Sequence, residues 1–186
     1  MAMPLAVHRF TVDQYHKMGD AGVFHEDDRV ELLDGQIVEM SPINPPHAGC
    51  VNRLTRDLTR ALGERGMVSV QNPVVLGQHW EPQPDIAVLR PRADGYASRH
   101  PEPNDILLLI EVADSSLGRD RADKVPTYAR TGVPEVWLVN LPAETIEVCT
   151  GPGPEGYRAV RRVHRGETLE PAMLPGVRIT TNEILG

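Results

Sequence analysis

The sequence predicts an α/β (α+β) fold in which helices flank a central mixed β-sheet. Two apolar runs, IAVL at 86–89 and DILLLIEV at 105–112, are typical of central strands that are buried on both faces. Stretches of helical period at 47–65 and 116–130 lie on either side of these runs. Further apolar runs follow after residue 134, with Pro- and Gly-rich turns between them, and these complete the sheet.

The composition indicates a globular protein, with 40% hydrophobic and 24% charged residues in a chain of 186. This length suits one domain, residues 1–186, and no apolar run is long enough to span a bilayer, so no membrane partner is expected. Cys50 and Cys149 lie far apart without metal-ligand spacing, which predicts reduced thiols in a cytoplasmic protein. The net charge of −7 argues against broad non-specific binding to nucleic acid, but it allows a local basic groove.

The first 40 residues predict a short helix and a hairpin. Thr11 is suited to cap a helix, and Asp34-Gly35 between two short apolar runs is a type I′ hairpin signal. Alternation along the first strand places Glu31 and Leu33 on one face, and Val30 and Leu32 on the other.

The helical period at 47–65 predicts a long helix that ends at Gly66. Its apolar stripe comprises Val51, Leu54, Leu58, Ala61 and Leu62. The arginines on its other faces are either a solvated surface or a ridge that faces phosphates; they are Arg53, Arg56, Arg60 and Arg65.

The second half of the chain predicts alternating strands and helices. Residues 67–77 form one bent strand or two strands around Asn72-Pro73, and residues 90–105 form a long loop. Ser116 or Asp120 begins a helix that ends before Gly132, with Pro126 in its first turn or two. The remaining elements are a strand at 135–140, an antiparallel C-terminal hairpin from 145–150 and 157–163, and a short helix at 180–186.

Each of the two apolar runs carries one carboxylate. Asp85 opens the first and Glu111 lies near the end of the second, so on neighbouring strands they would lie close together. Mg²⁺ or Mn²⁺ prefers such oxygen ligands, and the backbone carbonyl of Val112 offers a third. Lys124 follows in the predicted helix. It is one of two lysines in a chain whose other basic residues are arginines, which hints that this position needs an ammonium.

Each of these residues also has a structural interpretation. Asp85 after Pro84 would serve equally as a strand or turn cap, and Lys124 would pair with Asp120 four residues earlier. Glu111 is harder to explain in this way, because a buried unpaired carboxylate is costly. His47 at a helix start is more often a surface residue than a catalytic one. The seven histidines show neither an HExxH pattern nor paired zinc spacing.

Three motifs carry a resemblance to a known family. They are VELLDGQIVEMSP followed by His47, QPD at 83–85, and IEVADSSLGRDRADKVPTYARTGVPEVWLVN at 110–140. On these motifs the chain resembles the Uma2 family, also called DUF820, of restriction-endonuclease-like proteins in the PD-(D/E)XK nuclease superfamily.

The resemblance implies a PD-(D/E)XK core that binds Mg²⁺ or Mn²⁺ and cleaves DNA. The PD motif falls on Pro84 and Asp85 and the second acid on Glu111. The superfamily lysine is expected two residues later, where this chain has Ala113, and Lys124 takes its place. Glu31 matches the early acidic residue of the family. The accessory positions are His47, Gln83 and Asp120.

Three functions remain open from the sequence. The first is a divalent-metal-dependent DNA endonuclease, expected as a homodimer because two active sites related by a two-fold axis cut both strands most simply. The second is a non-catalytic module that binds nucleic acid or a partner, which the acidic net charge and Ala113 would favour. The third is an acid/base glycosidase using Asp85 and Glu111, and the aromatic content of only 4% counts against it.

Overall fold

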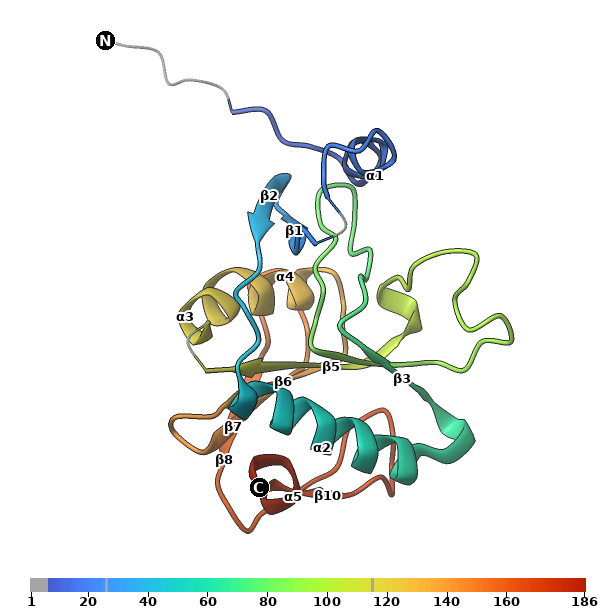
Figure 1. The fold of residues 1–186 in the computed structure, drawn as a ribbon. Coiled ribbons are helices and arrows are strands. Elements are labelled where there is room, and N and C mark those ends of the chain that lie inside the picture. The colour runs from blue at the N-terminus through green and yellow to red at the C-terminus, as the bar shows by residue number, and fades with distance from the viewer. Residues whose placement is uncertain (1–6, 26, 115) are drawn as a thin grey trace.

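A six-stranded mixed sheet forms the centre of the computed structural model, which describes residues 7–25, 27–114 and 116–186 (Figure 1). The strand order is β3-β4-β5-β6-β7-β8; β5 and β6 are parallel, and the other neighbours are antiparallel. The predicted fold class is therefore confirmed. The strands are β3 (Met67–Val70), β4 (Ile86–Leu89), β5 (Ile106–Ala113), β6 (Glu135–Asn140), β7 (Thr145–Thr150) and β8 (Ala159–Val163).

Helices cover both faces of this sheet (Figure 1). On one face α2 (Pro45–Leu62) and the short α5 (Thr181–Leu185) enclose a core that includes Ile110 and Val112 of β5. On the other face α4 (Val125–Arg130) places Tyr128 against Leu109. All eight residues of β5 are buried, which explains its almost uninterrupted apolar sequence.

The predicted long helix is α2, and its termini follow from local chemistry. The Asn44 side chain accepts a hydrogen bond from the backbone N–H of His47 at 3.0 Å, and two prolines occupy the first helical positions. The predicted stop at Gly66 closes the 3-10 turn that follows the α-helix, while the α-helix itself ends one turn earlier. The α-helix ends at Gly63, whose φ of 54° lies in the left-handed region, and the 3-10 turn η1 (Gly63–Arg65) follows.

The predicted hairpin consists of β1 (Val30–Leu33) and β2 (Gln36–Glu39). Asp34 and Gly35 both have positive φ, at 51° and 73°, as a type I′ turn requires. A side chain at position 35 would also come within 2.6 Å of Arg9 Cβ. Glu31, Leu32 and Leu33 are all buried, so both faces of β1 are covered.

A backbone bridge fixes this hairpin beside the loop that precedes β4. Leu32 and Glu81 exchange two backbone hydrogen bonds, of 2.8 and 3.3 Å. The bridge brings the middle of β1 next to residues 81–85, so Glu31 lies beside the segment that carries Asp85.

The predicted single helix from 116 to 130 is interrupted. A short turn, α3 (Leu117–Arg119), leads into the π-helical segment η3 (Asp120–Lys124) and then into α4. Pro126 therefore lies at the start of α4, after the π turn. In a continuous α-helix it would lack a hydrogen-bonding N–H and would clash with the carbonyl of Ala122, and the wider turn avoids that conflict.

Two further expectations are settled by the backbone. Of the two alternatives for 67–77, the structure has one strand, β3: Gln71 turns the chain with a φ of 51°, and residues 73–77 do not join the central sheet. Thr11 does cap α1 (Val12–Asp20), in a reciprocal capping box with Gln14.

The remaining short elements are η2 (Pro103–Asp105), β9 (Thr168–Leu169) and β10 (Ile179–Thr180). Within the described ranges, every helix is too short or too polar to cross a bilayer.

Candidate active site

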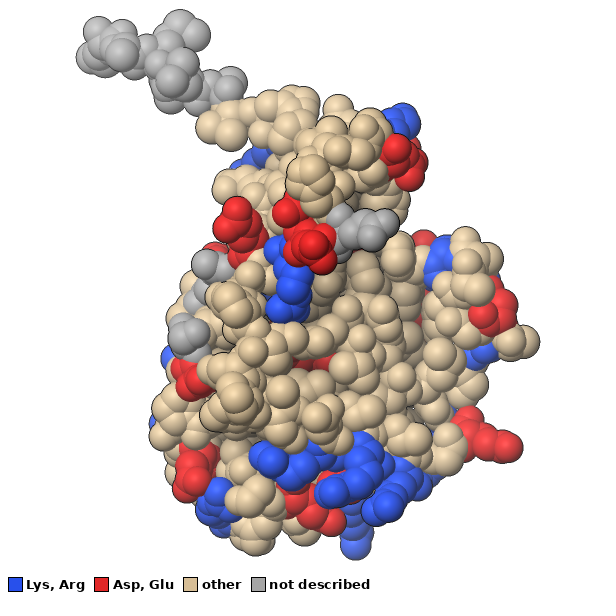
Figure 2. Space-filling model, in the orientation of Figure 1, with Lys and Arg blue, Asp and Glu red and all other residues tan. Residues whose placement is uncertain are grey.

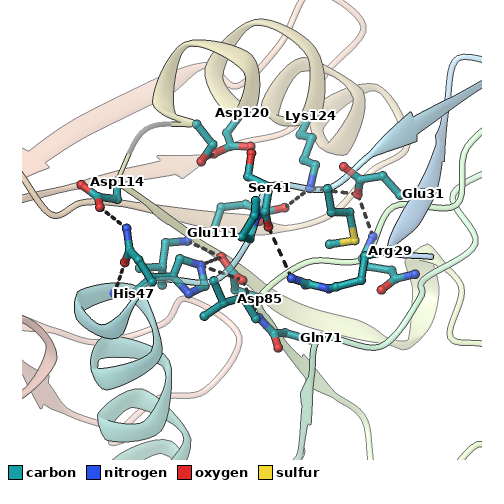
Figure 3. A pocket seen from close by; sticks show the side chains of 17 residues that line it. Arg29, Glu31, Ser41, His47, Gln71, Asp85, Glu111, Asp114, Asp120 and Lys124 are labelled. Carbon is teal, nitrogen blue, oxygen red and sulfur yellow. Dashed lines mark hydrogen bonds and ion pairs between the residues drawn. The ribbon is translucent and has the colours of Figure 1, made fainter. Parts of the chain in front are cut away.

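An acidic pocket lies where β1, the start of α2, the ends of β4 and β5 and the π turn meet (Figure 3). Its cavity volume of about 90 Å³ has room for several water molecules. Two permanent cations, Arg29 and Lys124, also line it, so the carboxyl groups outnumber the permanent cations by three. The carboxylates that line the pocket are Glu31, Asp85, Glu111, Asp114 and Asp120.

Asp85 is held rigidly at the bottom of this pocket. Its carboxylate accepts hydrogen bonds from the backbone N–H of Val112 at 2.8 Å and from the Gln71 side chain at 3.2 Å. His47 Nε2 lies 3.1 Å from the same carboxylate. The bond to Val112 crosses from the start of β4 to β5, so antiparallel pairing of these strands places Asp85 next to Glu111.

Glu111 lies on the face of β5 that is turned toward α4. The residue is 3% exposed, accepts a hydrogen bond from the Tyr128 hydroxyl at 2.5 Å, and lies 3.5 Å from Lys124 Nζ. Burial raises the pKa of Glu111 to about 8, and the nearby carboxylates of Asp120 and Asp85 add to this although Lys124 opposes it. One ammonium is therefore not enough to neutralise the carboxylates that surround Glu111.

Lys124 joins Glu31 to Glu111. Its ammonium lies 3.0 Å from Glu31 Oε2 and its side chain is only 6% exposed. Burial alone would lower the pKa of Lys124, but the carboxylates of Glu111 and Glu31 outweigh burial and raise it. Glu31 is fixed in turn by the backbone N–H of Gln83, at 3.1 Å.

The alternative pairing of Lys124 with Asp120 is not what the structure shows. Asp120 accepts a hydrogen bond from the Ser116 hydroxyl at 2.6 Å, while Lys124 reaches across to β1 and β5. Both residues are buried, and burial raises the pKa of Asp120. Since they begin and end the π turn, that turn directs both side chains into the pocket.

His47 faces the pocket instead of solvent. The hydrogen bond with Asp85 is the main reason that the pKa of His47 is raised, although burial opposes it. The other ring nitrogen, Nδ1, is buried and has no hydrogen-bond partner among the described residues. Gln83 contributes its backbone N–H to Glu31 and its side-chain amide to the Val30 carbonyl, so it holds β1 in place.

Sequence reasoning missed two supports of this pocket and one separate cluster. Tyr128 and Gln71 bind the two central carboxylates, yet neither stands in a pattern that would mark it. His16, Glu81 and His100 also converge, outside the pocket, although the spacing of the histidines predicted no metal site.

The chain matches the family described as "Uma2: Putative restriction endonuclease" over residues 12–182. It belongs to the Uma2 family. The fold of this Uma2 protein is similar to the crystal structure of "a putative nuclease belonging to DUF820 from Anabaena variabilis", with a TM-score of 0.72 and 13% identity. That similarity covers 95% of this chain and 97% of the other. No curated protein matches the sequence. The membership supports a nuclease-type function.

Proposed function

We propose that this Uma2 protein is a divalent-metal-dependent endonuclease that hydrolyses phosphodiester bonds of DNA. The observation that carries the proposal is the meeting of Asp85, Glu111 and Lys124 in one pocket with excess negative charge. Residues 1–186 act as one domain with a PD-(D/E)XK core.

The donor set of the pocket suits a hard cation. Asp85 and Glu111, with the backbone carbonyl of Val112, are the proposed ligands of Mg²⁺ or Mn²⁺, and waters would complete the shell. The raised pKa of Glu111 supports this, because a divalent cation would supply the positive charge that the pocket lacks. When bound, the cation lowers the pKa of a water and neutralises charge on the phosphate.

The groups around these ligands hold the Asp85 carboxylate and the Lys124 ammonium in place. Val112, Gln71 and His47 hold the Asp85 carboxylate, so little reorganisation is needed when phosphate enters. Lys124 keeps its ammonium beside Glu111 and is proposed to orient the attacking water or to stabilise charge that develops on phosphorus.

Glu31 holds Lys124 in this orientation, as Gln83 holds Glu31. His47, Gln83 and Asp120 are accordingly proposed as accessory residues.

The position of the lysine favours the enzyme over a non-catalytic binding module. Ala113 carries no charge at the position where the superfamily lysine is expected. Lys124, at the end of the π turn, brings an ammonium to Glu111 instead. A module that only binds nucleic acid has no need for a buried ammonium between two buried carboxylates, an arrangement that is costly to desolvate.

The surface beside the pocket supports DNA as the substrate. In Figure 2, acidic atoms lie in a hollow of this face, and basic side chains gather over α2, whose permanent cations are all arginines. Arg53 is committed to the carbonyls of Ile184 and Leu185, and Arg65 to those of Ala61 and Pro175. Arg56 and Arg60 are exposed, so they are the proposed phosphate contacts among the arginines of α2. Arg56 also forms an ion pair with the neighbouring Asp57, at 2.7 Å, and phosphate would have to compete with that carboxylate.

The double variant Arg56→Ala/Arg60→Ala should bind DNA more weakly, with the salt dependence of binding reduced. Loss of two phosphate contacts lowers the slope of log K against log [salt] by about 1.8. Fluorescence anisotropy in EDTA measures this without cleavage. Arg165→Ala, which removes an exposed arginine paired with Glu144, is the matched control and should leave the slope unchanged. An unchanged slope in the double variant would assign these arginines to a purely solvated face.

The activity itself is tested by incubating supercoiled plasmid with the chelator-stripped protein. Cleavage is expected with Mg²⁺ or Mn²⁺ and should be absent in EDTA. A panel of supercoiled, linear and single-stranded DNA covers the substrate forms. Absence of cleavage on every form with both metals, while DNA binding persists in EDTA, would favour the non-catalytic module.

The same experiment addresses assembly. We propose a homodimer, so linear product and a solution mass of twice 20.5 kDa are expected together. Double-strand cleavage by a 20.5 kDa species would contradict the dimer.

The free, buried Cys50 and Cys149 suit the proposed cytoplasmic setting, where thiols stay reduced.

A further inference from the structure

We infer that His16, Glu81 and His100 form a second metal site, which binds Zn²⁺ and fastens α1 and the 90–105 loop to the body of the protein. One ligand atom from each residue lies within 4.8 Å of those of the other two. The inference is independent of the nuclease chemistry, because none of the three residues lines the acidic pocket.

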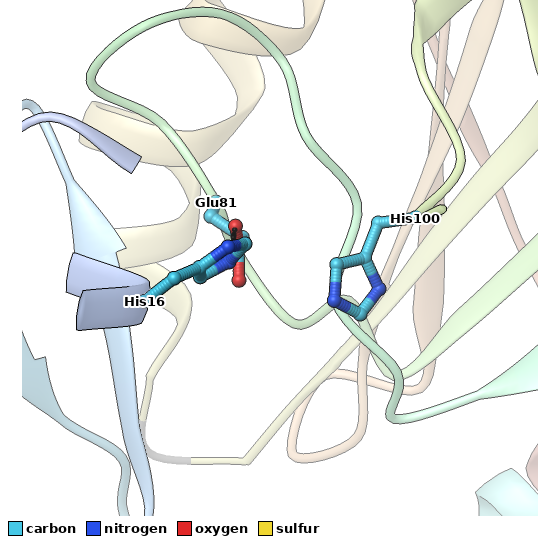
Figure 4. A group of neighbouring side chains, drawn as sticks. All are labelled: His16, Glu81 and His100. Carbon is cyan, nitrogen blue, oxygen red and sulfur yellow. Dashed lines mark hydrogen bonds and ion pairs between the residues drawn. The ribbon is translucent and has the colours of Figure 1, made fainter. Parts of the chain in front are cut away.

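The three residues come from segments that are distant in sequence (Figure 4). His16 lies on α1, Glu81 forms the backbone bridge with Leu32, and His100 is in the loop before η2. His16 Nε2 is already 2.7 Å from Glu81 Oε2, and the rings of His16 and His100 are 5.9 Å apart between centroids. Tetrahedral Zn²⁺ with bonds of about 2.0–2.1 Å needs ligand atoms about 3.4 Å apart. Both histidines are exposed, so their side chains are free to rotate toward that spacing, and no ligand atom has to close a gap larger than 4.8 Å.

Glu81 is a buried carboxylate without a full positive charge beside it. It is 3% exposed, and its side chain is paired with His16, which is neutral unless protonated. Burial raises the pKa of Glu81, and His16 and His100 only partly oppose this. A buried carboxylate without a full positive partner is costly. A Zn²⁺ ion held with two neutral imidazoles would supply that charge.

Helix α1 supplies an independent reason for such a site, because none of its residues is buried. A surface helix of nine residues is normally held by a buried apolar face; here Val12, Tyr15 and Met18 are only half-buried, and polar contacts add to them. They include Tyr15 Oη donating to the Val30 carbonyl at 3.0 Å and Val12 N–H donating to the Gln78 carbonyl at 2.8 Å. A metal ligand at His16, next to Tyr15, would strengthen this attachment.

The ligand types identify the cation class. Two imidazoles and one carboxylate suit a borderline transition metal such as Zn²⁺ better than the hard Mg²⁺ proposed for the acidic pocket. The protein would therefore hold two different metals at two sites with different ligands. Water would fill the fourth Zn²⁺ position, and no reaction at the ion is required.

The test is titration of the chelator-stripped full chain with Co²⁺, followed by visible absorption, and with Zn²⁺, followed by calorimetry. One ion per chain is expected at this site. His16→Ala and His100→Ala should each weaken binding by more than about tenfold, since loss of a direct ligand exceeds the 10–100-fold cost of losing a supporting residue. His164→Ala, at another exposed histidine, is the matched control and should bind like the unmodified chain.

Trypsin provides a second readout, because the Arg99–His100 bond lies next to a proposed ligand. Zn²⁺ should protect this bond in the unmodified chain and in Asp85→Asn, but not in His16→Ala. Zn²⁺ binding that survives both histidine substitutions in the Asp85→Asn background, where the acidic pocket has lost a ligand, would overturn the inference. So would the absence of Co²⁺ absorption, Zn²⁺ binding heat and Zn²⁺ protection in the unmodified chain. Asp85→Asn separates this result from the nuclease proposal, because it should lose cleavage and keep the Zn²⁺ site.

Discussion

Substitution of Glu111 by Gln, or of Asp85 by Asn, is expected to reduce DNA cleavage by about a thousandfold or more. The physical reason is that each removes one anionic ligand of the proposed cation, whose effect on the transition state is several kcal/mol. Glu111→Gln keeps an acceptor for the Tyr128 hydroxyl, so the fold should survive. The measurement is the cleavage rate at saturating Mg²⁺, together with calorimetry of Mn²⁺ binding, which should be lost in parallel.

The matched control for these variants lies in the same pocket. Asp114→Asn makes the same chemical change in a lining carboxylate that is bonded to Asn44 and is not a proposed ligand. It should retain cleavage within a few-fold. Full activity of both Glu111→Gln and Asp85→Asn would exclude them as metal ligands. An equal loss in Asp114→Asn would show that the pocket depends on its total charge instead of on these two ligands.

Substitution of Lys124 by Met is expected to lower the free energy of unfolding by about 3–5 kcal/mol in EDTA. The reason is that Glu31 and Glu111 would stay buried without their ammonium, at 3.0 and 3.5 Å in the unmodified protein. Urea unfolding measures the change. Mn²⁺ should recover part of it, because the ion would supply positive charge to the same carboxylates.

The chain offers a matched control, since its other lysine is on the surface. Lys17 pairs with Asp13 in an exposed i,i+4 arrangement, so Lys17→Met should change the free energy of unfolding by less than about 0.5 kcal/mol. In the double variant Lys124→Met/Glu31→Gln, part of the lost stability should return. A loss below about 1 kcal/mol in Lys124→Met would mean that the ammonium does not neutralise these carboxylates.

The local features of the fold could be read from the sequence because they depend on neighbouring residues. Asp34-Gly35 predicts its hairpin turn, Thr11 its helix cap, and the apolar run of β5 a strand buried on both faces. The π turn before Pro126 could not be read in this way. A proline inside a helical pattern signals a conflict, but several backbone solutions resolve it, and the local sequence does not choose among them.

The candidate site shows the same difference between what local sequence predicts and what tertiary packing decides. The sequence by itself determined which carboxylates are out of place, because Asp85 directly precedes one apolar run and Glu111 lies within another, and these runs pair as strands. Only the tertiary structure decided which groups meet them. Lys124 pairs with Glu31 rather than Asp120, Tyr128 binds Glu111, and His16 reaches Glu81. These contacts join residues from separate elements, and their distances depend on how β1, the π turn and α1 pack, which no local spacing in the chain encodes.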